Sequence, residues 1–232
     1  MIDRAAAQAS HPEAQAAAVE RLQGMERKNV ETARRLLGSR PLNAEIQLHG
    51  SFAATGRGHG TDRALVAGLL GMQPDDPRIP QSFELARQAG LQFSVGSVTL
   101  RGAHPNTAVL HLTGEDGRSL EVVGASIGGG RISICQIDGI TTNFGADYNT
   151  LIVHNLDTPG HVAAVTGCLS DHAINIATMQ LYRSTAGGYA VMVLECDQPL
   201  PDALIAELRG MQGIVKVTGL NLAQQTETKE GA

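Results

Sequence analysis

Apolar residues recur at two different periods along the chain. Over Glu13–Leu37, a stretch rich in Ala, Gln, Glu and Arg, they recur every three or four positions, which predicts an amphipathic helix within an N-terminal segment, residues 1–38. Gly38 and Pro41 follow at the positions where such a helix would end. In Ala44–Ala53 the apolar residues alternate with polar ones, which is typical of a half-buried strand.

Residues 39–148 mix both periods, and we expect them to form an α/β unit. Thr61-Asp62 is expected to cap one helix, and Pro80–Ala89 to form a second. After Gly90 the apolar residues recur at every second position, as they do in strands. Strands are expected over residues 92–100, 107–113, 119–125 and 131–137. Glu115-Asp116-Gly117 joins two of these strands and is a hairpin signal.

Residues 149–223 predict a separate unit with the order strand, helix, strand, strand, helix, strand, the split ferredoxin-like arrangement. Thr158 and Pro159 are expected to start its first helix. Both faces of Tyr189–Cys196 are apolar, so we expect this unit to associate with another copy through its sheet. The fold class is therefore α/β (α+β), and residues 224–232 are expected to form a disordered tail.

Composition narrows the range of partners. The net charge of −5 argues against nucleic acid or an anionic membrane, and no run approaches the ~20 apolar residues of a membrane span. The chain starts with no hydrophobic leader, which predicts a cytoplasmic protein.

The cysteine count also excludes some chemistry. The chain has three cysteines, Cys135, Cys168 and Cys196, and no Cys-x-x-Cys pair, so neither a disulfide framework nor a zinc ribbon is indicated. Three thiols are too few for an iron–sulfur cluster held by four thiolates. We therefore predict no metal ligands in this chain.

A glycine-rich loop, residues 56–62, is the first candidate site. Its glycines permit close approach of the backbone to a ligand, and the N–H groups of the following helix point back at the loop. His59 is the candidate catalytic residue, because an imidazole can transfer a proton near neutral pH. The candidate substrate-binding residues are Arg57, Gly58, Gly60, Thr61 and Asp62. An ordinary glycine turn with a helix cap is the alternative.

A second candidate site lies at the start of a helix in the last unit. The free N–H groups there could hold a small anion, and Asn175 is expected to reach the edge of the same pocket. The candidate regulatory ligand-binding residues are Asp157, Gly160, His161 and Asn175. Plain capping is again the alternative. Gly128-Gly129-Gly130 lacks dinucleotide-binding spacing and is expected to be a hairpin connection.

Several motifs follow one another along the chain: His49–Ala53, Gly58–Asp62, Asp76–Pro80, His104–Thr107 and Val123–Gly130. In this order they resemble the β subunit of iron–sulfur-dependent L-serine dehydratase (L-serine ammonia-lyase). Residues 149–223 carry Asp157-Thr158-Pro159-Gly160 and Ile174-Asn175-Ile176, and they resemble an ACT domain.

The resemblance implies a middle domain similar to the allosteric substrate-binding domain of phosphoglycerate dehydrogenase, followed by a regulatory ACT domain. It also implies that a separate α subunit binds the 4Fe–4S cluster, which fits the few cysteines of this chain. The implied reaction is the elimination of water from L-serine, with hydrolysis of the product to pyruvate and ammonia. By resemblance, His59 lies at the α/β interface as a candidate proton-transfer residue.

One stretch departs from the family pattern. Val19–Gly24 stands where the family has Gly-Pro-Ser-Ser-Ser-His-Thr, and Ser10-His11 is too far upstream to replace it. This departure favours a second hypothesis, a non-catalytic amino-acid-sensing regulatory protein with the same two domains. A third hypothesis, a regulatory part of a serine-biosynthetic dehydrogenase, is weakened by the lack of a dinucleotide fingerprint.

Overall fold

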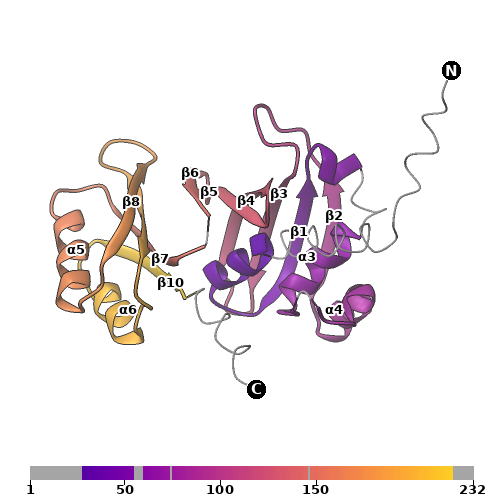
Figure 1. Ribbon diagram of the computed structural model, residues 1–232, viewed down its shortest axis with the longest axis horizontal. Helices are drawn as coiled ribbons and strands as arrows, with labels where there is room; N and C mark the ends of the chain where they lie inside the picture. Colours follow the sequence, from indigo (N-terminus) through magenta and orange to yellow (C-terminus); the bar gives the residue numbers. More distant parts are fainter. Residues whose placement is uncertain (1–27, 55–59, 74, 146, 222–232) are drawn as a thin grey trace.

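The computed structural model describes residues 28–54, 60–73, 75–145 and 147–221. Two β-sheets lie side by side, and helices pack against each of them (Figure 1). Residues 28–37 form a helix whose side chains Val30, Ala33 and Leu37 are buried, as the periodicity predicted. The earlier part of that predicted helix and the predicted disordered tail lie outside the described residues.

The first sheet has the strand order β2-β1-β3-β4-β5-β6. Only β1 and β2 run parallel, and the other neighbours are antiparallel. Its unit consists of β1 (Pro41–Leu48), α3 (Thr61–Leu69), the 3₁₀ helix η1 (Ile79–Gln81), α4 (Ser82–Gln88), β2 (Gln92–Ser97), β3 (Thr107–Gly114), β4 (Ser119–Gly128), β5 (Arg131–Ile137) and β6 (Ile140–Phe144).

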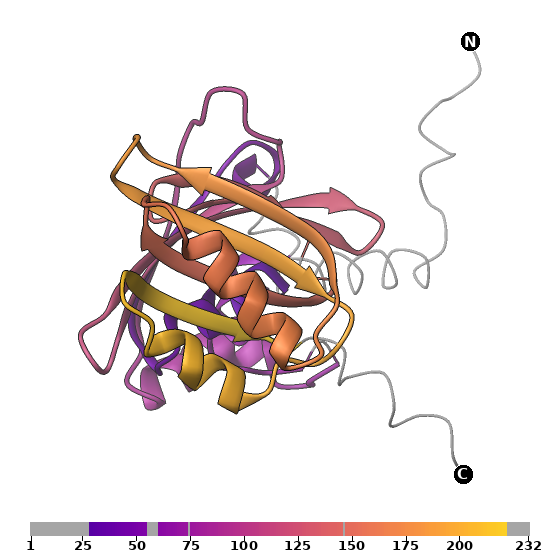
Figure 2. The same ribbon diagram turned by 90° about the vertical axis from the view of Figure 1, so that its left-hand side faces the viewer.

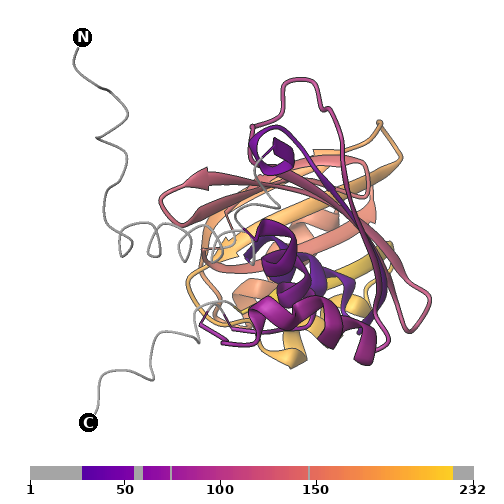
Figure 3. The ribbon, with the colours of Figure 1, turned by 90° about the vertical axis from the view of Figure 1, so that its right-hand side faces the viewer.

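The two faces of the first sheet differ in polarity. Ile46, Leu110 and Val122 lie on one face and are fully buried in a core with helix 28–37 and α3. Figure 3 shows this helical side of the unit. On the other face, His111 of β3 pairs with Glu121 of β4 at 3.3 Å, and both side chains are partly exposed. The alternation of apolar and polar positions therefore sets one face inward and the other toward water.

The second sheet has the order β10-β7-β9-β8, in which all neighbours are antiparallel. It is the predicted split ferredoxin-like arrangement. Its elements are β7 (Asn149–Leu156), α5 (His161–Asp171), β8 (Ile176–Arg183), β9 (Tyr189–Cys196), α6 (Asp202–Arg209) and β10 (Ile214–Leu220). Helices α5 and α6 cover one face of this sheet (Figure 2), and Leu169, Leu204 and Leu208 pack there against Val153 and Met192.

The other face of the second sheet is buried against the first unit. Ile152 and Val193, which point away from α5 and α6, belong to the same apolar cluster as Leu36, Ile134 and Phe144. Strand β6 contacts both β8 and β9. The two sheets are therefore joined through a single apolar core.

This packing removes the reason that the sequence offered for self-association, the two apolar faces of Tyr189–Cys196, while self-association itself stays a prediction. Met192 and Leu194 of β9 lie under the helices, whereas Val191 and Val193 lie against the first unit, and all four are buried within one chain. The apolar faces of β9 thus reflect a strand covered by two layers and give no ground for association with a second copy.

Two strand boundaries also differ from the prediction. The strand expected to reach Ala53 ends at Leu48, because Gly50 turns the chain with a φ of 57° and residues 51–54 are helical. Strand β6 was not predicted. It is short, and a tight turn at Asp138 and Gly139, both at positive φ, separates it from β5. None of the helices in the described part of the chain has the length and hydropathy that a bilayer span requires.

His154 of β7 generates a prediction on pH. Burial lowers the pKa of His154 below its ordinary value of 6.5, and the cross-strand neighbour Lys216 lowers it further, against a smaller opposite effect of Asp138. Below about pH 6.5 the unfolded chain then binds a proton that the folded chain binds only at lower pH, so this group reduces stability as the pH falls. His154→Gln should therefore lose less stability than wild type between about pH 7.5 and about pH 5.5 in urea denaturation. Parallel pH profiles of wild type and variant would contradict this account.

Candidate functional site

The glycine-rich loop ends at the start of α3, at one end of the first sheet. Of the predicted residues, Gly60, Thr61 and Asp62 are described, whereas Arg57, Gly58 and His59 lie outside the described residues. Gly60 is the N-cap of α3 with a φ of 73°, and no side chain caps this helix. The predicted capping role of Thr61 is therefore wrong, because Thr61 is already the first helical residue and is buried.

Asp62 lines a cavity of about 280 Å³ beside this loop. The cavity lies where the parallel strands β1 and β2 end, since Leu48 pairs with Ser97. Its other lining residues are Leu48, Phe52, Ala53, Val95, Gly96 and Ser97. The Asp62 carboxylate accepts a hydrogen bond from the backbone N–H of Arg63 at 2.8 Å. The described part of the loop therefore places a carboxylate beside a mainly apolar cavity.

Three of the sequence motifs meet at this same end of the sheet. The His49 N–H donates to the carbonyl of Thr107 at 2.9 Å, and the Ser51 N–H donates to the carbonyl of Pro105 at 2.8 Å. The Ser126 N–H donates to the carbonyl of Asn106 at 2.9 Å. Segments that are far apart in the sequence thus form one backbone-linked cluster near the start of α3.

The histidines of this cluster bond to backbone. The His49 Nδ1 accepts a hydrogen bond from the Leu100 N–H at 3.2 Å, and the His104 Nδ1 accepts one from the Asn106 N–H at 3.2 Å. Each ring fixes the course of a neighbouring loop. These backbone contacts through Nδ1 support a structural role for both histidines.

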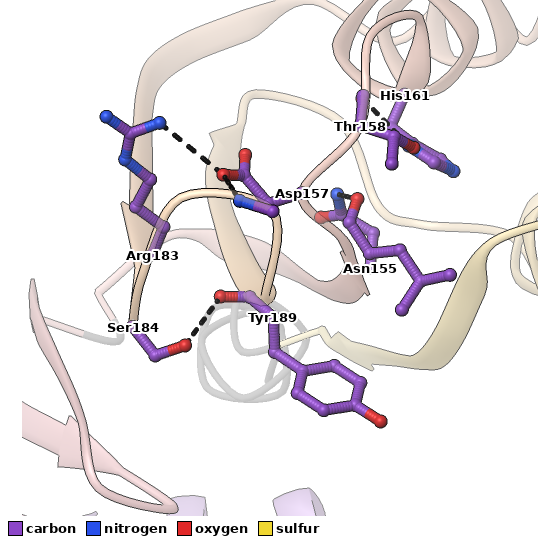
Figure 4. A network of polar contacts seen from close by, with 9 residues as sticks. Asn155, Asp157, Thr158, His161, Arg183, Ser184 and Tyr189 are labelled. Atoms are coloured by element: carbon purple, nitrogen blue, oxygen red, sulfur yellow. Dashed lines mark hydrogen bonds and ion pairs between the residues drawn. The ribbon is translucent and has the colours of Figure 1, made fainter.

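The second candidate site is the connection from β7 to α5 (Figure 4). The Asp157 Oδ2 accepts a hydrogen bond from the Gly187 N–H at 3.0 Å and lies 3.4 Å from the Arg183 Nη1. Asp157 therefore links this connection to the turn between β8 and β9. Gly160 is the N-cap of α5 and has a φ of 101°. Glycine adopts this left-handed backbone conformation readily, because it has no Cβ.

His161 closes the other side of this connection. Its Nδ1 lies 3.1 Å from the Thr158 hydroxyl, and its Nε2 lies 3.1 Å from the Gln212 carbonyl. No side chain caps α5, so the predictions of Thr158 as its cap and Pro159 as its first residue are wrong. The Thr158 hydroxyl instead orients the imidazole.

Asn155 is a polar residue at this site that sequence reasoning missed. Its side chain is buried, its Nδ2 donates to the Leu156 carbonyl at 2.6 Å, and its Oδ1 has no hydrogen-bond partner. A buried amide oxygen that finds no partner among the described residues is costly, so Asn155 stands out in an otherwise apolar strand. The available signal was an asparagine inside the apolar run of β7.

Asn175 does not join this site within one chain. Strands β7 and β8 both pair antiparallel with β9, so they run parallel to each other. Asp157 follows the end of β7, whereas Asn175 precedes the start of β8 and donates to the Asp197 carboxylate at 2.6 Å. The predicted proximity of Asn175 to Asp157 is therefore wrong for a single chain.

Comparison with known proteins gives the family. Residues 14–90 match the serine dehydratase β chain family, and residues 149–211 match the ACT domain family. The chain is 38% identical to the L-serine dehydratase β chain of Peptoniphilus asaccharolyticus, over 72% of this chain and 76% of that protein. The chain belongs to the serine dehydratase β chain family. A probable L-serine dehydratase β chain of Bacillus subtilis (strain 168) is 34% identical, over 80% of this chain and 84% of that protein.

Other relatives match this chain over a smaller part of their own length. D-3-phosphoglycerate dehydrogenase of Bacillus subtilis (strain 168) is 29% identical over 69% of this chain and 30% of that protein. Among solved structures, the ACT domain of a GTP pyrophosphokinase of Chlorobium tepidum is 26% identical, with a TM-score of 0.27, and covers 31% of this chain and 95% of that chain.

The three cysteines of this chain do not fit an iron–sulfur cluster held by four thiolates. Cys135 lies on β5, Cys168 on α5 and Cys196 on β9. Three cysteines on three separate elements cannot supply the four thiolates of an iron–sulfur cluster.

The cluster of motifs generates a prediction on stability. At Gly50, with a φ of 57°, an added Cβ would lie 2.5 Å from the carbonyl oxygen of Pro105. Gly50→Ala should therefore lower the free energy of unfolding by ~1–3 kcal/mol beyond the cost of placing alanine at a positive φ. The extra loss arises because the backbone of Pro105 cannot move aside easily. Urea denaturation measures the difference.

Gly90→Ala is the matched control. Gly90 has a φ of 75° and no heavy atom within 4 Å of an added Cβ, so this variant should lose only the ~1 kcal/mol of left-handed backbone strain. Equal losses in the two variants would mean that the approach of Gly50 to Pro105 is unimportant.

Proposed function

We propose that this chain is the β subunit of a two-subunit L-serine dehydratase and completes its active site at the interface with an α subunit. The observation that carries the proposal is similarity over 72% and 80% of the chain to proteins named L-serine dehydratase β chain and probable β chain. The meeting of three motifs beside the start of α3 supports this end of the first sheet as the catalytic one.

The reaction removes a proton from the α-carbon of L-serine and the hydroxyl group from its β-carbon, and the aminoacrylate released hydrolyses to pyruvate and ammonia. A 4Fe–4S cluster on the α subunit would supply the Lewis acid for the hydroxyl. His59 of this chain suits the proton transfer, and Arg57 suits the substrate carboxylate. The remaining substrate-binding residues of the proposal are Gly58, Gly60, Thr61 and Asp62.

The test is reconstitution with the α subunit and an anaerobic assay of pyruvate. His59→Ala and His59→Gln should each reduce kcat by ~100-fold or more while the complex still assembles, because general acid–base catalysis contributes on that scale. His111→Gln is the matched control, since His111 lies on the polar face of the first sheet. Normal turnover of His59→Ala would refute the catalytic role.

A non-catalytic amino-acid sensor is the second candidate, and the departure at Val19–Gly24 favours it. These residues lie outside the described part of the chain. The same reconstitution separates the two functions. Pyruvate formation by the wild-type complex supports the dehydratase, whereas saturable amino-acid binding without pyruvate formation supports the sensor.

We further propose that the connection from β7 to α5 binds a regulatory amino acid. The carboxylate of Asp157 suits the ammonium group, and the N–H groups at the start of α5 suit the carboxylate. The space beside Gly160 is open, since a Cβ added there would meet no other heavy atom of the described chain within 4 Å. His161 borders the same N–H groups.

A second copy of the chain would complete this regulatory site. Strand β8 is an edge strand, and its apolar side chains Met179 and Leu181 are 36% and 50% exposed. Antiparallel pairing of two β8 edges would bring the start of one strand beside the end of the other. Asn175 of one copy would then approach Asp157 of the other, which gives Asn175 a role that it cannot have within one chain.

Leu181→Glu tests this self-association. The variant should weaken dimerisation by at least ~10-fold, because pairing would bury the new carboxylate among apolar side chains. Light scattering across a dilution series measures the change. Val215→Glu is the matched control, because Val215 is 58% exposed on the opposite edge strand, β10. A monomeric wild type, or equal effects of both variants, would contradict pairing through β8.

A further inference from the structure

A cluster of three potential metal ligands lies between α5 and α6, away from both sites described above. Cys168 and His172 are four residues apart, and the His172 N–H donates to the Cys168 carbonyl at 3.2 Å, so both side chains lie on one side of α5. Glu207, in the last turn of α6, faces them from the neighbouring helix. Helices α5 and α6 contact each other on the outer face of the second sheet (Figure 2).

The donor atoms are already close together. The His172 Nε2 lies 2.9 Å from the Glu207 Oε2, and the Cys168 Sγ lies within 4.8 Å of both partners' donor atoms. Tetrahedral zinc, with bonds of ~2.0 Å to nitrogen and oxygen and ~2.3 Å to sulfur, holds its ligands roughly 3.3–3.6 Å apart. Small rotations of the partly exposed His172 and Glu207 side chains are therefore enough to seat an ion.

We propose that Cys168, His172 and Glu207 form a binding site for a zinc-type divalent cation that bridges α5 and α6. One thiolate, one imidazole and one carboxylate are the donor types that zinc takes, whereas magnesium and calcium prefer oxygen alone. Cys168 is only 3% exposed and anchors the inner side of the site. The side chains of His172 and Glu207 are 24% and 52% exposed, so a fourth ligand can enter from solvent.

The Glu207 carboxylate supplies negative charge to the cluster. Hydrogen bonds from His172 and Cys168 lower the pKa of Glu207, which keeps it a carboxylate. Burial raises the pKa of Cys168 to about 11, and the carboxylates of Glu207 and Asp171 contribute to the rise. The metal-free thiol therefore keeps its proton at neutral pH, and binding of the cation replaces that proton with a bond from sulfur to metal.

The alternative is a plain ion pair between His172 and Glu207 that links two helices. The two accounts differ in their response to metal. An ion pair is indifferent to micromolar zinc, whereas a site that exists only in the folded chain gains thermal stability from the metal.

The experiment uses the full chain after removal of metals with a chelator. Titration with Co²⁺ should produce a thiolate-to-cobalt charge-transfer band that saturates at a single ion per chain, and Zn²⁺ should displace it. Zn²⁺ should raise Tm, and Mg²⁺ should not. Calorimetry in two buffers of different ionisation enthalpy should detect release of a proton from the thiol.

Variants assign the ligands. His172→Gln and Glu207→Gln should each weaken Zn²⁺ binding by at least ~10-fold, and Cys168→Ser should abolish the charge-transfer band. Cys135→Ser, on β5, is the matched control and should retain band and affinity. His172 and Glu207 are partly exposed, so their variants decide the matter even where Cys168→Ser fails to fold. Absence of the band, or unchanged affinity in both surface variants, would overturn the proposal.

Discussion

The apolar core shared by the two sheets is the interaction on which the rest of the structure depends. Each sheet buries a face in it, and helix 28–37 contributes Leu36 to the same cluster as Phe144 of β6 and Val193 of β9. A hydrogen bond of 3.1 Å from the Arg35 guanidinium to the Asn221 carbonyl ties this helix to the end of the second sheet. One core fixes the positions of both sheets. The two candidate sites, at the end of the first sheet and at the β7–α5 connection, therefore belong to one packed structure.

Most of the fold could be predicted from the sequence, because the apolar period changes clearly between helices and strands and glycines mark the turns. The helix starts were less predictable. Thr61 and Thr158 have the chemistry of N-caps, but a side-chain cap needs an extended backbone at the capping residue. The chain enters α3 and α5 through left-handed glycines, Gly60 and Gly160, so that geometry is not available to the threonines.

The candidate sites were harder to predict, because they depend on which ends and faces of the elements meet. Asp157 and Asn175 flank two strands that are nearby in the sequence, yet the parallel course of these strands separates them. The sequence does indicate that Cys168 and His172 share one side of a helix, because they are four residues apart. The sequence gives no sign that Glu207 joins them, because Glu207 reaches them only through the packing of α6 beside α5.

The buried apolar face of the second sheet bears on whether its unit can stand alone. Here transfer of residues 149–221 alone would uncover Ile152, Val191 and Val193, which are buried in the shared core. The second sheet therefore needs the first one to keep this face out of water, and we expect the two sheets to unfold together as one cooperative unit.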